Sequence, residues 1–254
     1  MTKIILSGCN GRMGHVVTEL SAQDPEAQIV AGVDVFGEGS GQYPVFQTYA
    51  EIGADVEADV MIDFSLPAAF DSMLDFAIAR KLPVIVCTTG LSDEQLKRLD
   101  QASKEIAVLR SANMSLGINL LLKLVKEAAA TLTKAGFDIE IVEHHHNQKK
   151  DAPSGTALAL ADSMNGELGG DYTYVYDRTS RSQKRDPKEI GISSVRGGTI
   201  PGIHEVIYAG PDEIVEIKHT AYSRSIFAQG ALSAAKFLAG ESSGFYTMAD
   251  VVGV

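Results

Sequence analysis

Hydrophobic and polar residues alternate along the first 113 residues in the pattern of a parallel sheet covered by helices. Short β-branched runs predict five strands, at residues 3–7, 28–33, 60–63, 83–87 and 107–110. Amphipathic stretches predict helices at 11–21 and 67–80. A third helix is predicted to begin at Ser92, which forms a capping-box pattern with Gln95. Strands that alternate with helices indicate an α/β fold, a Rossmann-like doubly wound parallel sheet.

The second half of the chain has a different order of predicted helices and strands. A Leu-rich helix is predicted at 116–134, an alternating strand at 137–144 and a helix at 154–168. Three strand-like runs, 191–195, 203–208 and 213–219, then follow without helices between them, and the polar segment 177–189 is interpreted as a surface loop. We therefore expect a second α+β domain built on a mixed or antiparallel sheet. The expected boundaries are 1–113 for the first domain, with 226–254 returning to it through a helix at 225–239, and 114–225 for the second.

Composition and charge narrow the classes of partner. The formal charge of −11 argues against nucleic-acid binding, and the apolar runs are too short to predict a membrane span. Two cysteines without metal-type spacing are typical of a reducing compartment, so we expect a cytoplasmic protein. An anionic substrate would need locally concentrated positive charge, which segments 144–150 and 218–224 supply.

Three glycines between the first predicted strand and helix indicate a dinucleotide site. Gly8, Gly11 and Gly14 have the spacing G-x-x-G-x-x-G, which by itself is also compatible with a purely structural turn. Asp34 follows the second strand 20 residues after Gly14 (34 − 14 = 20), where an acid binds the adenosine ribose hydroxyls. Because Val35 follows instead of an arginine, we expect NADH as the preferred cofactor and NADPH as the alternative, with Arg12 as the nearby cation.

Two further turns follow predicted strands at the same edge of the sheet. Residues 63–67 (DFSLP) follow the third strand, and 88–90 (TTG) follow the fourth. Ligands of open α/β sheets collect at the carboxyl ends of the strands, so these turns are candidates to hold the nicotinamide and its ribose. Each could also be a simple capped start of a helix.

Titratable groups are densest in residues 143–156, between a predicted strand and a predicted helix. Zinc binding is disfavoured because the spacing H-E-x-x-H is absent, and three adjacent histidines could also be solvated surface residues. We favour proton transfer and anion binding, with histidine titrating near neutrality and lysine as a fixed positive donor. Residues 153–156 (PSGT) have the composition of a helix start whose N–H groups can receive a carboxylate.

These motifs resemble those of the dihydrodipicolinate reductases, along the whole chain. The resemblance rests on GCNGRMG at 8–14, DFSLP at 63–67, TTG at 88–90, AxNxSxG at 112–117, E-x-HHxxKxDAPSGTA at 143–157, HTAYSR at 219–224 and GFYTMADV near the C-terminus. It implies hydride transfer from a nicotinamide dinucleotide to 4-hydroxy-tetrahydrodipicolinate, a small dicarboxylate of lysine and diaminopimelate biosynthesis. It also implies a homotetramer assembled through the second domain.

The resemblance further assigns roles to individual residues. It implies His145 as the catalytic histidine and Lys149 as the proton donor. The implied substrate-binding residues are His146, Ser154, Gly155, Thr156 and Thr89. The expected cofactor-binding residues are Gly8, Asn10, Gly11, Arg12, Met13, Gly14, Asp34, Phe64, Ser65, Thr88 and Gly90, and no metal ligand is expected.

Two other functions are compatible with parts of the sequence. One is a different Rossmann amino-acid dehydrogenase, which the PSGT helix start after HHxxK disfavours. The other is an NADH-binding sensor without catalysis, which the acidic composition does not support.

Overall fold

The computed structural model of the protein describes residues 1–37, 39 and 41–253. By their contacts they divide into two compact units. Unit 1 comprises Met1–Ser115 and Ser225–Val254, and unit 2 comprises Leu116–Arg224. No helix in the described part of the chain combines the length and the apolar character that a membrane crossing needs.

The described residues of unit 1 form a seven-stranded parallel sheet in the order β12-β6-β5-β4-β1-β2-β3. The strands are β1 (Thr2–Ser7), β2 (Ala27–Val33), β3 (Val45–Phe46), β4 (Val60–Asp63), β5 (Val84–Val86), β6 (Ala107–Leu109) and β12 (Gly244–Tyr246). The five predicted strands are confirmed. Strands β3 and β12 were not predicted because, unlike the equally short β5 and β6, they are not fully buried apolar runs. The strand order reverses between β1 and β4, because β2 and β3 lie on one side of β1 and the connection from β3 to β4 crosses to its other side, as in a doubly wound fold.

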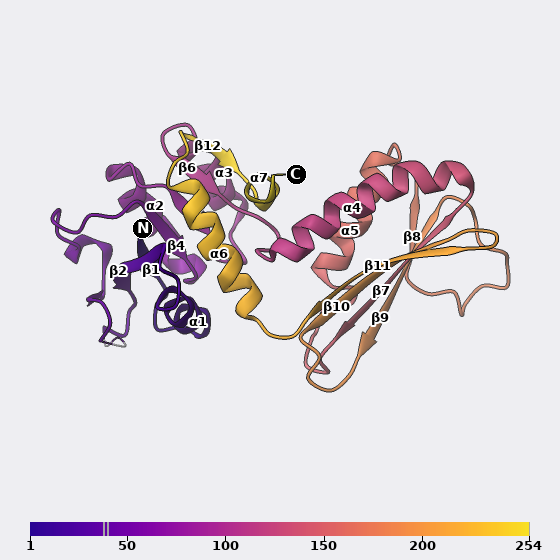
Figure 1. Ribbon diagram of the computed structural model, residues 1–254, viewed down its shortest axis with the longest axis horizontal. Coiled ribbons are helices and arrows are strands. Elements are labelled where there is room, and N and C mark those ends of the chain that lie inside the picture. Colours follow the sequence, from indigo (N-terminus) through magenta and orange to yellow (C-terminus); the bar gives the residue numbers. More distant parts are fainter. Residues whose placement is uncertain (38, 40, 254) are drawn as a thin grey trace. The chain divides into compact units, whose positions relative to one another are not determined.

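Helices cover both faces of this sheet (Figure 1). The helical elements of unit 1 are α1 (Arg12–Ser21), η1 (Tyr49–Glu51), η2 (Pro67–Ala69), α2 (Phe70–Ala79), α3 (Asp93–Ala102), α6 (Ser225–Leu238) and α7 (Met248–Val252). Side chains of α1 and α6 share a core with Ile4 and Leu6, whereas those of α2 and α3 share one with Ile5. Strand residues that alternate between the two cores explain why the β1 sequence is a continuous apolar run. The capping box of Ser92 and Gln95 is confirmed.

Unit 2 is built on a five-stranded mixed sheet in the order β11-β10-β7-β9-β8. The strands are β7 (Asp138–His145), β8 (Thr173–Val175), β9 (Glu189–Arg196), β10 (Gly202–Ala209) and β11 (Ile214–Ala221). Strand β10 pairs antiparallel with β7 and β11, while β9 pairs parallel with β7 and β8. The expectation of a second sheet, mixed or antiparallel, is therefore confirmed in its mixed form. Strand β8 was not predicted, and β9 begins two residues earlier than expected.

Two helices, α4 (Leu116–Leu132) and α5 (Gly155–Glu167), lie side by side on one face of this sheet (Figure 1), and η3 (Thr133–Ala135) follows α4. Their apolar faces contribute Leu121, Val125 and Leu160 to one core with Ile141 and Tyr208 of the sheet. The segment between β8 and β9 is a loop, but its arginines are not simply solvated: they pair with acids of the sheet. These pairs join Arg178 to Glu140 and Glu189, Arg181 to Glu189, and Arg185 to Asp138 and Glu140.

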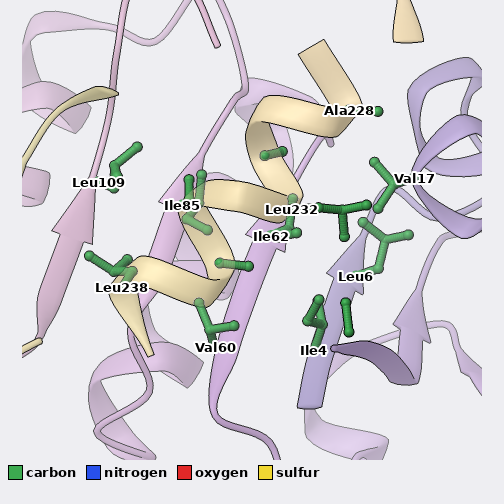
Figure 2. Packing of buried hydrophobic residues seen from close by; sticks show 14 of the residues in the cluster. Ile4, Leu6, Val17, Val60, Ile62, Ile85, Leu109, Ala228, Leu232 and Leu238 are labelled. Atoms are coloured by element: carbon green, nitrogen blue, oxygen red, sulfur yellow. The ribbon is translucent and has the colours of Figure 1, made fainter. Parts of the chain in front are cut away.

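The core of unit 1 gives a test of the packing. Figure 2 shows Leu232 of α6 among the strand residues Leu6 and Ile62. Leu232 is 0% exposed, so Leu232→Ala should destabilise unit 1 by about 3–5 kcal/mol, through lost burial and the cavity that remains. Native-state hydrogen exchange of the β4 amides measures this loss. As the control, Leu66→Ala at a position that is 71% exposed should change the stability of unit 1 by less than about 0.5 kcal/mol. Equal effects of the two substitutions would contradict this packing.

Candidate active site

A cavity of about 1000 Å³ opens at the carboxyl edge of the sheet in unit 1. Its walls come from the β1–α1 turn, the end of β2, the segment around η1, and the β4–α2 turn. Six of the predicted cofactor residues line it: Gly8, Asn10, Gly11, Asp34, Phe64 and Ser65. Three apolar side chains more than 70% exposed, Val35, Phe36 and Leu66, also line it. Exposed apolar groups around a few polar ones are typical of a small-molecule site.

The β1–α1 turn needs glycine for two separate reasons. Gly8 has φ +72°, and a Cβ there would lie 2.6 Å from the carbonyl oxygen of Phe64. A Cβ on Gly14 would collide with the backbone oxygens of Gly8 and Cys9, so this glycine lets α1 pack closely on the turn. Helix α1 begins at Arg12, directly after the turn, so its N-terminal N–H groups lie beside the cavity residues Asn10 and Gly11. The turn therefore has the geometry that an anionic pyrophosphate requires.

Asp34 is held at the rim of the cavity by backbone donors. The N–H of Asn10 donates to its Oδ2 (3.0 Å), and the N–H of Phe36 donates to its Oδ1 (3.1 Å). The side chain of Asn10 in turn donates to the carbonyl of Phe36 (2.6 Å). This carboxylate is thus oriented before any ligand arrives, and each oxygen keeps a lone pair for a hydroxyl donor.

A second carboxylate, Asp63 at the end of β4, is fully buried and joins three turns. It accepts from the Ser7 hydroxyl (2.9 Å), the Thr88 hydroxyl (2.7 Å) and the Ser65 N–H (3.1 Å). The Ser65 hydroxyl is buried in the cavity lining without a partner among the described residues. An unpaired polar atom in a cavity wall is suited to a polar group of a ligand.

The other predicted cofactor residues do not line this cavity. They are Arg12, Met13, Gly14, Thr88 and Gly90. Thr88 instead donates to Asp63, and Gly14 has the packing role described above. The predicted substrate residue Thr89 belongs to unit 1, whereas the other predicted substrate residues belong to unit 2.

A cluster in unit 2 is centred on Glu143 of β7, which is 0% exposed. Arg196 of β9 donates to both carboxylate oxygens, from Nη2 to Oε1 (2.7 Å) and from Nη1 to Oε2 (2.9 Å). The Ser154 N–H donates to Oε1 (3.1 Å), and Oε2 lies 2.5 Å from Nδ1 of His145. Burial would raise the pKa of Glu143, but hydrogen bonds from Arg196 and His145 lower it to about 2. The carboxylate is therefore ionised at neutral pH.

His145 shares the buried face of β7 with Glu143, while His144 lies on the opposite face. An ionised Glu143 accepts only, so Nδ1 of His145 carries the proton and donates, and Nε2 faces away from the carboxylate. Burial lowers the pKa of His145, and the hydrogen bond that His145 donates to Glu143 only partly offsets this effect. Gly202 lies beside the ring: a Cβ there would be 3.2 Å from Nε2.

Lys149 and the start of α5 complete the cluster. The Lys149 ammonium pairs with Asp151 (2.9 Å), and its positive charge, together with that of Arg196, also lowers the pKa of His145. Ser154 caps α5, since its hydroxyl accepts from the Ala157 N–H (3.1 Å). His146 directly follows β7 and is partly exposed. The structure thus brings together the predicted residues His145, His146, Lys149, Ser154, Gly155 and Thr156 in one strand-to-helix connection.

Sequence reasoning gave no role to three members of this cluster: Glu143, Arg196 and His204. Glu143 was detectable, because a residue two positions before His145 shares its face of the strand. Arg196 lies opposite His145 in the parallel β7–β9 register, 51 residues away (196 − 145 = 51), which no local pattern reveals. His204 of β10 is buried beside Ser154. Among the described residues, no three His, Cys, Asp or Glu side chains form a group that could hold a metal ion.

A Rossmann-type sheet with a ligand cavity at its glycine turn, and a second unit with a histidine–lysine cluster, define a dinucleotide-dependent oxidoreductase. Family models agree: that for the N-terminus of dihydrodipicolinate reductase matches residues 2–114, and that for its C-terminus matches residues 117–252. The chain therefore belongs to the dihydrodipicolinate reductase family, a family of nicotinamide-dinucleotide-dependent reductases, and the resemblance stated from its motifs is confirmed.

Similar proteins support this membership along the full length. The chain is 54% identical to the 4-hydroxy-tetrahydrodipicolinate reductase of Caldanaerobacter subterraneus subsp. tengcongensis, over 99% of this chain and 98% of the relative. It is 49% identical to the enzyme of the same name from Clostridium novyi, with the same coverage. A dipicolinate-bound dihydrodipicolinate reductase from Paenisporosarcina sp. TG-14 has the same fold, with a TM-score of 0.81, 22% identity and 97% of each chain covered.

The depressed pKa of Glu143 predicts a particular pH dependence. Its folded-state pKa of about 2 lies below the ordinary 4.5, so the carboxylate contributes stability above pH 4.5 that is lost as the pH falls toward 2. The free energy of unfolding of the wild type should exceed that of Glu143→Gln by about 3 kcal/mol at neutral pH, and this difference should decrease below pH 4.5. Thermal unfolding at a series of pH values measures it. The exposed-site control Glu213→Gln should show no such gap, and a gap for Glu143→Gln that does not change with pH would refute this account.

Proposed function

We propose that the chain reduces 4-hydroxy-tetrahydrodipicolinate to tetrahydrodipicolinate with a reduced nicotinamide dinucleotide, the 4-hydroxyl leaving as water, in diaminopimelate and lysine biosynthesis. The full-length relatives carry the name of this reaction. The observation that carries the proposal is the Glu143-centred cluster, which combines an oriented histidine, a lysine and a helix N-terminus in one connection. Those are the groups that an anionic ring needs when it accepts a hydride and then a proton.

The cavity of unit 1 suits the dinucleotide. Gly8 and Gly11 would bring backbone N–H groups to the pyrophosphate, and Asp34 would accept from the adenosine ribose. Phe64 and the unpaired Ser65 hydroxyl would contact the nicotinamide and its ribose. The residues in or directly after these turns that do not line the cavity remain proposed cofactor residues: Arg12, Met13, Gly14, Thr88 and Gly90. When bound, the reduced nicotinamide supplies the hydride.

The proton comes from unit 2. Lys149 is the proposed donor to the reduced ring, because its side chain is only 22% exposed and its ammonium group is held in an ion pair with Asp151. His145 is the proposed catalytic histidine. Glu143 fixes its tautomer and ring orientation, so that Nε2 presents a constant polar group toward the substrate. Positive charge from Lys149 stabilises the negative charge that builds on the conjugated imine.

The start of α5 is the proposed site for a substrate carboxylate. Ser154, Gly155 and Thr156 begin the helix, where backbone N–H groups and the helix dipole favour an anion. His146 and Thr89 are the further proposed substrate contacts. The name of the structural neighbour from Paenisporosarcina, which binds dipicolinate, supports a site for a planar ring dicarboxylate.

The charges around the cavity support a preference for NADH over NADPH. Its lining contains two acids, Asp34 and an Asp75 that is paired with Arg98, and, among the described residues, no lysine or arginine. A 2′-phosphate beside Asp34 would be repelled in a partly apolar setting, where charge interactions exceed those in water. Arg12, the first residue of α1, is outside the lining and is the cation nearest the turn in sequence.

Oligomerisation through unit 2 is supported by the uncovered face of its sheet. Helices α4 and α5 cover one face. The opposite face carries the partly exposed apolar residues Val142, Ile203 and Ile207, with Val195 42% exposed. Apolar patches of this kind mark association surfaces. A homotetramer with these faces inside is the proposed assembly.

We also propose that the protein works in the cytoplasm. Its two cysteines, Cys9 and Cys87, are not joined in a disulfide. Burial raises the pKa of both thiols, so both remain protonated and unreactive near neutral pH. This cysteine chemistry is typical of a reducing compartment, where a biosynthetic enzyme also finds its reduced dinucleotide.

The role of Lys149 is tested by substitution. Lys149→Ala should lower kcat by about 10²–10⁴-fold with little change in the Kd for NADH, because the general acid acts in the chemical step only. Steady-state oxidation of NADH with freshly condensed pyruvate and aspartate semialdehyde gives kcat. The exposed neighbour provides the matched control, since Lys150→Ala should keep near-wild-type kcat. Near-normal turnover of Lys149→Ala would remove it as the donor.

The cofactor preference is tested by comparing kcat/KM for the two dinucleotides. We expect NADH to exceed NADPH by about tenfold or more, and Asp34→Ser to reduce that ratio by removing the repulsion. Asp75→Asn is the control, because Asp75 lines the cavity but is paired with Arg98. A wild-type enzyme that favours NADPH would defeat the assignment.

Sedimentation equilibrium tests the assembly. We expect the mass of four chains, each of 27.1 kDa, and a smaller species for Ile207→Arg, which places a charge in the proposed interface. A wild-type monomer at micromolar concentration would contradict the proposed homotetramer.

A further inference from the structure

His204 of β10 contacts two members of the proposed site. Its Nε2 lies 3.0 Å from the hydroxyl of Ser154, and its ring meets the ring of His145 edge-on, with centroids 5.2 Å apart at 71°. The residue is 4% exposed. Ser154 is the N-cap of α5, and its oxygen already accepts from the Ala157 N–H (3.1 Å).

The hydrogen-bonding capacity of His204 selects its tautomer. Its Nδ1 is buried and has no hydrogen-bond partner among the described residues. With the proton on Nδ1, a buried N–H would be unpaired and the Ser154 hydroxyl would donate to Nε2. With the proton on Nε2, only a lone pair is unpaired, and Nε2 donates to Ser154. Unpaired buried N–H groups are rarer than unpaired acceptors, so the second arrangement is favoured.

We propose that His204 is a positioning residue: it donates from Nε2 to the oxygen of Ser154 and thereby reserves the Ser154 hydroxyl proton for a substrate carboxylate. A hydroxyl has two acceptor lone pairs and one proton. The N–H of Ala157 and the N–H of His204 fill both lone pairs, so the only remaining capacity of Ser154 is donation. In the opposite tautomer, an oxygen lone pair would face the anion. The inference deepens the proposed function and rests on its assignment of Ser154 to the substrate.

The ionisation state of His204 keeps this arrangement constant. Burial, together with the neighbouring His145, lowers the pKa of His204 to about 3. The ring is therefore neutral throughout the pH range of an enzyme assay, and a single proton is shared between its two nitrogens. The neutral ring therefore has only the two tautomers compared above, with the proton on Nδ1 or on Nε2.

Long-range ¹H–¹⁵N correlation spectra test the tautomer without any assay of activity. The protein has six histidines, and the signals of His204 are those that disappear in His204→Gln. We expect the proton on Nε2 and a bare Nδ1. A spectrum with the proton on Nδ1 would overturn the proposal, whether or not the enzyme turns over.

Binding of dipicolinate, measured by calorimetry in the presence of NADH, tests the consequence. Ser154→Ala should raise its Kd by about tenfold and His204→Leu by about fivefold, because the hydroxyl proton is no longer directed. His204→Gln, which keeps an N–H at a similar reach, should remain within about twofold of wild type. Tyr208→Phe, a loss of a buried hydroxyl on the same strand, is the control for destabilisation alone and should not change Kd.

The double variant separates positioning from a structural role. If His204 acts through Ser154, then adding His204→Leu to Ser154→Ala should leave Kd unchanged. Effects that multiply, or a wild-type Kd for His204→Leu, would overturn the proposal. Should His204→Leu fail to fold, His204→Asn replaces it, since its amide is too short to reach Ser154 and it should weaken binding as Leu does.

Failure of the proposed function gives a different result. If wild type binds dipicolinate but does not oxidise NADH with the condensed substrate, the proposed function fails, while the tautomer and the binding cycle still decide the role of His204. If wild type turns over normally and His204→Leu keeps both its Kd for dipicolinate and its KM for the substrate, only the His204 proposal fails.

Discussion

The buried carboxylate of Glu143 is the interaction on which the proposed chemistry depends. It receives hydrogen bonds from Arg196 of β9, from His145 on its own strand and from the backbone of Ser154 before α5. A charge buried without partners would cost several kcal/mol, and these donors offset that cost. One group therefore fixes the tautomer of the histidine and the position of the helix start together. Loss of Arg196 would disturb both.

The two units carry different parts of the proposed site. Unit 1 keeps its polar groups at one edge of a sheet whose faces are filled by two separate cores, so its glycine turn, Asp34 and Ser65 are presented by a rigid support. Unit 2 has one core under α4 and α5 and places its titratable groups where β7 ends and α5 begins. The proposed function thus assigns hydride supply to unit 1 and proton supply to unit 2, and each unit has its own hydrophobic core.

Much of this arrangement could be predicted from the sequence. Long periodic elements were readable because burial repeats with the period of the element, and the turn with Gly8, Gly11 and Gly14 was readable because backbone geometry demands glycine. The residues that hold the site residues in place could not be predicted from the sequence. Arg196 and His204 reach Glu143 and Ser154 through sheet register, which depends on residues far apart in sequence. Strands β3, β8 and β12 are short and only partly buried, so they do not form the apolar runs by which β5 and β6 were predicted.

A crystal structure with dipicolinate bound is the most direct test of the central claim, that one buried carboxylate aligns the histidine and the helix start on a common substrate. The account predicts one carboxylate of the ligand at the N-terminus of α5, within hydrogen-bond distance of the Ser154 hydroxyl and the Gly155 N–H. It also predicts the ring of the ligand against His145, with the Glu143–Arg196 pair intact. Dipicolinate bound away from α5, or a His145 ring turned away from Glu143, would contradict it.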